Sequence, residues 1–163
     1  MNLSLPSASQ LLVRFGARDI TEVAVPDDKR VIEPDLLVAA AAGEPLDDWS
    51  AEDIAIAVAT LARIADAVTR ARSEVSFYLR FRPVGSDAPD WVTDDLAEIA
   101  RYHLYDDAGA ETSTVRVIYK DVIKRLETLA AEDQQQGASE AGESGLQVTS
   151  QPRLMTRRSL RGL

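Results

Sequence analysis

Residues 50–83 read SAEDIAIAVATLARIADAVTRARSEVSFYLRFRP, with no glycine or proline before Pro83. Such a stretch allows one helix of about 30 residues, roughly 45 Å long. Ser50 and Asp53 predict its beginning, because the serine hydroxyl can accept a hydrogen bond from the Asp53 amide and acids favour the positive end of the helix dipole. Apolar residues at spacings of three, four and seven predict one buried stripe, made of Ile54, Val58, Leu61, Ala65, Val68, Val75 and Leu79.

Shorter helices are predicted before this long one. One spans residues 9–15 and another spans residues 35–42, and each is followed by a glycine that suits a helix end. Residues 17–33, which separate them, are predicted to form a loop, in which residues 21–25 could pair briefly as a strand.

Two more helices are predicted after the long one. The first runs from Pro89 to about Tyr105, and the second runs from a cap at Thr112 or Ser113 to about Ala131. Their inward residues, by helical spacing, are Val92, Leu96, Ile99 and His103 in the first, and Val115, Ile118, Val122, Leu126 or Arg125, and Leu129 in the second. Striped helices with short joints predict an all-α fold, a small antiparallel bundle around one long central helix.

The composition changes after the last predicted helix. We expect a helical domain at residues 1–133, a flexible linker at 134–145 that holds no large apolar residue, and an extended, basic C-terminal tail at 146–163. The first 150 residues carry 27 acids against 14 Lys and Arg, a formal charge of −13, whereas residues 151–163 carry four Arg and no acid. A basic, apolar tail suits docking on a partner, with a solvated tail as the alternative. The candidate docking residues are Arg153, Leu154, Met155, Arg157, Arg158, Leu160, Arg161 and Leu163.

Catalytic and cofactor motifs are missing from the sequence. The absence of cysteine excludes disulfides and thiolate nucleophiles, and His103 is the only histidine. There is no G-x-S-x-G elbow and no glycine-rich phosphate loop. Four acidic pairs fall at predicted helix starts or turns, where aspartate is favoured by capping; they are 27–28, 47–48, 94–95 and 106–107. We therefore expect no catalytic residue, no metal site, no cofactor and no enzymatic activity.

The longest apolar run, residues 36–42, is too short to cross a bilayer, and the N-terminus lacks the pattern of a signal peptide. We therefore expect a soluble protein without a membrane partner. Its acidic body should repel the phosphate backbone of nucleic acid rather than bind it. Phe77, Tyr78 and Phe81, with two neighbouring arginines, could stack on nucleic acid bases, but their place at the end of a long helix favours a hinge or a subunit interface.

Five phrases of the sequence resemble the phage Mu-type head–tail adaptor family. They are SQLLVRFG at 9–16, ADAVTRARSEVSFYL at 65–79, IARYHLYDD at 99–107, VIYKDVIKRL at 117–126 and RLMTRRSLRGL at 153–163. Their order and spacing agree with the family over most of the chain. Two places depart from it: residues 27–50 are longer and richer in alanine, and Arg80–Phe81–Arg82 stands where the family commonly has Arg–Tyr.

The resemblance implies a structural subunit of a homo-oligomeric ring, expected to hold about twelve copies. The ring would sit beneath the phage portal protein, extend the DNA channel without binding DNA specifically, and carry the next neck or tail protein. The protein would be assembled in the host cytoplasm and reside in the neck of the virion. The candidate interface or hinge residues are Phe77, Tyr78, Phe81, Arg101, Tyr102 and Tyr105.

Two other functions remain open at this point. A stopper or tail-terminator protein would act in the same neck, but such folds usually carry substantial β-sheet. A small acidic phage protein that mimics DNA and inhibits a host nucleic-acid enzyme would line up its acids on one exposed face. Circular dichroism separates the first from a helical adaptor, and the oligomeric state separates the second.

Overall fold

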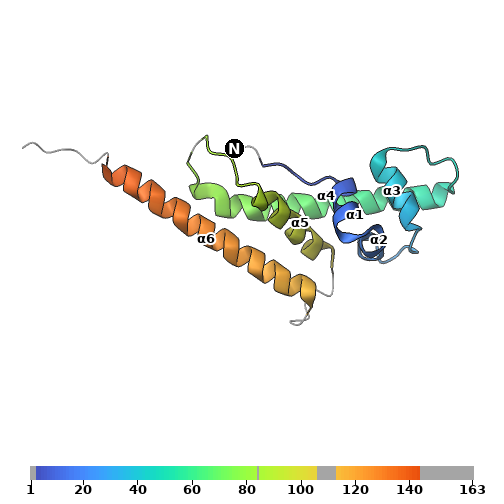
Figure 1. Ribbon diagram of the computed structural model, residues 1–163. Helices are drawn as coiled ribbons and strands as arrows, with labels where there is room; N and C mark the ends of the chain where they lie inside the picture. The colour runs from blue at the N-terminus through green and yellow to red at the C-terminus, as the bar shows by residue number, and fades with distance from the viewer. Residues whose placement is uncertain (1–2, 84, 106–112, 144–163) are drawn as a thin grey trace, which may run out of the picture.

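The computed structural model describes residues 3–83, 85–105 and 113–143, with side chains as far as residue 137. These ranges contain α-helices and one short 3-10 helix and no strand, which confirms the all-α prediction. In Figure 1 the long helix α4 (Ala51–Tyr78) runs through the molecule, α5 (Trp91–Leu104) returns along it, and α6 (Thr114–Glu143) reverses direction again. The predicted antiparallel arrangement around one long helix is therefore present.

Helix α4 begins where the sequence predicts. The Ser50 hydroxyl accepts a hydrogen bond from the Asp53 amide at 3.1 Å, and the helix passes into the 3-10 helix η1 (Leu79–Phe81) just before Pro83. The predicted stripe, however, is only partly correct: Val68, Val75 and Leu79 are buried, but Ala65 is exposed and Ile56 and Ile64 are buried instead. Val58 is 59% exposed, whereas Ala57 and Ala71 are fully buried. Small alanines face the neighbouring helices because they allow close approach, and a pattern based on large apolar residues does not detect them.

Three short helices pack around the N-terminal half of α4 (Figure 1). They are α1 (Ala8–Phe15), α2 (Ala17–Ala24) and α3 (Pro34–Ala42). Two of them match the prediction. Helix α2 corrects it, since the sequence predicts a loop there, in which residues 21–25 could pair briefly as a strand. The helix forms because Ile20, Thr21 and Ala24 all turn into the core, and the Thr21 hydroxyl donates to the Ala17 carbonyl at 2.6 Å. Burial of one helical face outweighs the β-propensity of this segment.

Helix α5 lies between α4 and α6 and supplies much of the core. Val92, Leu96 and Ile99 are fully buried, as predicted, while His103 is half-buried. On α6, Val122 and Leu126 are fully buried, and Ser113 provides the predicted cap by accepting from the Arg116 amide at 3.2 Å.

Helix α6 continues well beyond the predicted end at Ala131. It reaches Glu143, so residues 134–143 of the predicted flexible linker are helical. Alanine, glutamine and glutamate are good helix formers, and a formed helix propagates at little cost, so Gly137, at about 1 kcal/mol, does not end it. Residues 144 and 145 and the predicted docking tail at 146–163 lie outside the described residues.

Candidate assembly surfaces

An exposed cluster of two phenylalanines and one arginine lies where α4 passes into η1. Phe77 and Phe81 are 56% and 39% exposed, and the Arg80 guanidinium carbon lies 3.8 Å and 4.6 Å from the two ring centroids. Arg80 makes no ion pair with any carboxylate that the structure describes. We call Phe77, Arg80 and Phe81 the aromatic patch. Exposed aromatic groups with a cation are typical of surfaces that contact another molecule, because transferring the rings from water into a contact lowers the free energy.

The neighbouring Tyr78 turns inward, toward a junction of three helices. There, Glu74 of α4 accepts hydrogen bonds from His103 Nε2 of α5 at 3.1 Å and from the Tyr119 hydroxyl of α6 at 2.5 Å. The hydrogen bond from His103, followed by that from Tyr119, lowers the pKa of Glu74 despite its partial burial. Burial and the hydrogen bond to Glu74 raise the pKa of Tyr119. This junction ties the three long helices together by charge-assisted hydrogen bonds.

The junction makes stability depend on pH in a defined direction. A lowered pKa in the folded state means that Glu74 stabilises the protein above its ordinary value of 4.5, and that this contribution is lost as pH falls through the folded-state pKa. We expect Glu74→Gln to cost about 1–2 kcal/mol at pH 7 and progressively less below pH 4.5. Urea midpoints of both proteins from pH 7 to pH 3 measure this difference.

The control is Asp66→Asn, which breaks an exposed pair between Asp66 and Arg70 on the outside of α4. It should cost less than about 0.5 kcal/mol at every pH, since exposed pairs contribute little. A difference between wild type and Glu74→Gln that stays constant down to pH 3 would contradict the role of the junction.

Tyr102, a predicted interface or hinge residue, contacts another residue of the same chain. Its ring stacks on that of Tyr119 with centroids 3.9 Å apart and planes 10° apart, so it joins α5 to α6 beside the junction. Arg101 and Tyr105 also point to an intramolecular partner: the Arg101 guanidinium lies 4.8 Å from the centre of Phe15 on α1 and 5.7 Å from that of Tyr105. These contacts hold helices of one chain together.

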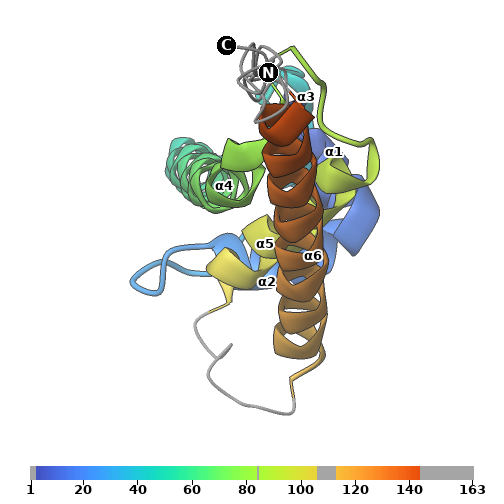
Figure 2. The ribbon, with the colours of Figure 1, turned by 90° about the vertical axis from the view of Figure 1, so that its left-hand side faces the viewer.

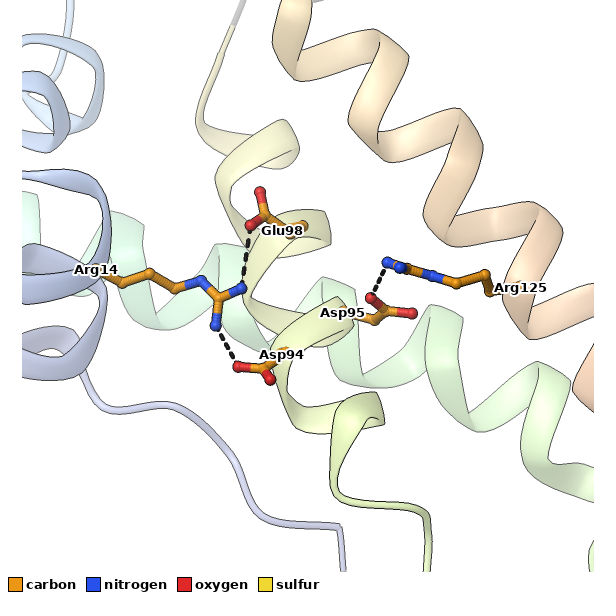
Figure 3. A network of polar contacts seen from close by, with 5 residues as sticks. All are labelled: Arg14, Asp94, Asp95, Glu98 and Arg125. Atoms are coloured by element: carbon orange, nitrogen blue, oxygen red, sulfur yellow. Dashed lines mark hydrogen bonds and ion pairs between the residues drawn. The ribbon is translucent and has the colours of Figure 1, made fainter.

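Ion pairs complete the links between α5 and its neighbours. Figure 3 shows Arg14 of α1 between Asp94 and Glu98 of α5, and Arg125 of α6 reaching Asp95. The sequence predicted a capping role for the Asp94–Asp95 pair. Asp94 does lie in the first turn of α5, whereas Asp95 is 3% exposed and burial raises its pKa despite the nearby arginine. Asp95 is therefore a buried contact to α6 and not a cap.

A groove runs between α1 and the first half of α5. Its volume is about 420 Å³, and it is lined by Pro6, Ser9, Gln10, Leu11, Val13, Arg14, Thr93, Asp94 and Ala97. Val13 is 86% exposed, the most exposed of the large apolar side chains in the described part of the chain. We call this the α1/α5 groove. A second groove, of about 410 Å³, lies between the N-terminal segment and α4, where Leu5, Pro6, Leu61 and Val68 are among its lining residues.

The structure thus separates the six predicted interface or hinge residues. Phe77 and Phe81 are on the surface, whereas Tyr78, Arg101, Tyr102 and Tyr105 are partly buried. Sequence reasoning missed the α1/α5 groove. The exposure of Val13 could have been found from helical spacing, because Leu11, Leu12 and Phe15 occupy the other face of its helix. All predicted docking residues of the tail fall outside the described residues.

No group of three or more His, Asp or Glu that could hold a metal ion occurs among the residues that the structure describes. Their helices also include none that is long and apolar enough to span a bilayer.

A protein-family model described as "Bacteriophage Mu, Gp36" matches residues 7–151, which include four of the five phrases of the resemblance. No curated protein and no solved structure matches the chain.

Proposed function

The chain belongs to the bacteriophage Mu Gp36 family, and from that premise we propose that it is a head–tail adaptor subunit of a tailed phage. In this proposal, copies form a closed ring beneath the portal, extend the DNA channel and carry the next neck or tail component. The protein acts as a structural part of the virion neck, after assembly in the host cytoplasm, without enzymatic activity or a cofactor.

The observation that carries the proposal is the presence of two apolar surfaces on different elements. The aromatic patch lies at the end of α4, and the α1/α5 groove lies between α1 and α5. A ring needs two different lateral surfaces on each subunit, because a contact that repeats by rotation joins one surface to another and not to itself. A monomer would leave both surfaces in water.

The charge distribution supports passage of DNA through such a ring. The first 150 residues carry a formal charge of −13, and many of their carboxylates are exposed, including Asp47, Asp48 and Glu52. An acidic wall repels DNA phosphates and lets the duplex slide, whereas a basic wall would release counterions and bind it.

Mixing the protein with purified portal rings tests the proposal. We expect a complex whose mass, by native mass spectrometry, corresponds to one ring of this protein per portal, and whose symmetry in electron micrographs is that of a closed ring. A protein that stays monomeric or dimeric beside the portal, and instead inhibits a host nucleic-acid enzyme, would replace the adaptor with the DNA-mimic alternative.

A further inference from the structure

The aromatic patch and the α1/α5 groove are separated within one chain. In Figure 2, α1 and the beginning of α5 lie on one side of α6, and the C-terminal end of α4 lies on the other. The two surfaces therefore do not cover each other within one molecule. We infer that the α1/α5 groove of one copy receives the aromatic patch of a second copy. This inference rests on the proposed function, since it assigns the lateral contact of the ring.

The groove fits an apolar occupant. Pro6, Leu11 and Ala97 line it as buried apolar residues, and Val13 leaves 86% of its surface in water when the groove is empty. Phe77 and Phe81, 56% and 39% exposed, are the only phenylalanines exposed at this level among the described residues. Burying such rings against Val13 removes apolar area from water on both sides, at about 25 cal/mol per Å².

The charges at the two surfaces are complementary. Arg80 stands between the two phenylalanine rings and makes no ion pair with the described carboxylates. Asp94, which pairs with Arg14 of the same chain, lines the groove with its side chain 65% exposed. Asp90 lies one helical turn before it, is exposed and makes no ion pair in the described ranges. An arginine that enters beside the two rings would meet these carboxylates. This pairing also offsets the repulsion that is expected between two copies of net negative charge.

The contact joins two different surfaces, so it can repeat from copy to copy. An incomplete row of copies then has a free patch at one end and a free groove at the other until the ring closes. A two-fold dimer that used only one of the two surfaces would leave the other exposed.

Disulfide trapping tests the contact directly, because the natural chain has no cysteine to interfere. One full-length chain carries Val13→Cys, and a second chain, enlarged by a tag, carries Phe81→Cys. A disulfide forms only where two Cβ atoms come within about 4.5 Å. After mild oxidation of the mixture, we expect the mixed dimer to exceed both same-chain dimers on a non-reducing gel. Adding Arg80→Glu to the second chain should reduce the mixed dimer, and adding Asp90→Arg and Asp94→Arg to the first should restore part of it.

A matched control replaces Val13→Cys with Val58→Cys, which lies on the exposed side of α4 at 59% exposure. It should give no excess of mixed dimer. Equal trapping at Val58, or none at Val13 when both proteins keep their wild-type circular dichroism spectra, would overturn the inference.

A chain that carries both Val13→Cys and Phe81→Cys then separates this inference from the proposed adaptor function. A ladder of species beyond the dimer supports a ring through this contact, whereas trapping that stops at the dimer keeps the contact and contradicts the ring. If rings form on the portal but no disulfide forms between the two cysteines, the adaptor function is kept and this contact is rejected.

Discussion

Deletion of residues 145–163 is expected to abolish the joining of this protein to portal-bearing heads while leaving a folded, helical protein. The helices that form the core end before this segment. Among the residues whose side chains are described, the last fully buried apolar one is Leu126, and the Arg82–Asp133 contact ties α6 to the end of η1. The deleted residues carry all four arginines of the C-terminal tail and no acid. A basic segment with interspersed leucines can bind an acidic and apolar surface of the portal and order on contact.

The measurement is the fraction of heads that sediment with the protein, compared between the full chain and the shortened one. Circular dichroism and urea unfolding establish that the shortened chain still folds. A full-length control with Leu154, Leu160 and Leu163 changed to serine separates the apolar contribution from the charge. If the shortened chain joins heads normally, the tail does not dock on the portal.

Leu96→Ala is expected to destabilise the protein by about 2–5 kcal/mol, a large part of the stability of an ordinary domain. Leu96 is fully buried in the middle of α5, the helix that contacts both α4 and α6. The substitution removes apolar contacts and leaves a cavity that rigid helices on two sides cannot close. The melting temperature should fall by about 4–20 °C, since each kcal/mol shifts it by about 2–4 °C in a protein of this size.

Val58→Ala is the matched control, because Val58 is also a large apolar residue within a helix but is 59% exposed. Its effect should stay within about 0.5 kcal/mol. If Leu96→Ala and Val58→Ala cost the same, then α5 does not form the centre of the bundle. Urea unfolding of the three proteins at one pH provides the comparison.

The sequence by itself determined the features that depend on neighbouring residues. Ser50 and Ser113 each cap a helix through a hydroxyl three residues before the amide it accepts from, so both beginnings could be predicted. Gly43 ends α3 in the left-handed conformation at φ 74°, which glycine adopts without strain. The exposed Phe77 and Phe81 could also be selected as interface candidates, because they follow a long helix and precede Pro83.

Only the tertiary structure decided the features that depend on distant residues. Residues 17–24 are helical because one face is buried against α3 and α4, a gain that no local preference contains. Tyr102 was selected as an interface or hinge residue, and only the folded chain shows that the ring of Tyr119 stacks on it. The α1/α5 groove likewise needs α1 and α5, about 80 residues apart along the chain, to be packed together. Local hydrogen bonds and backbone conformation depend on residues that are close together in the sequence, whereas the free energy of burial depends on which surfaces meet in the folded chain.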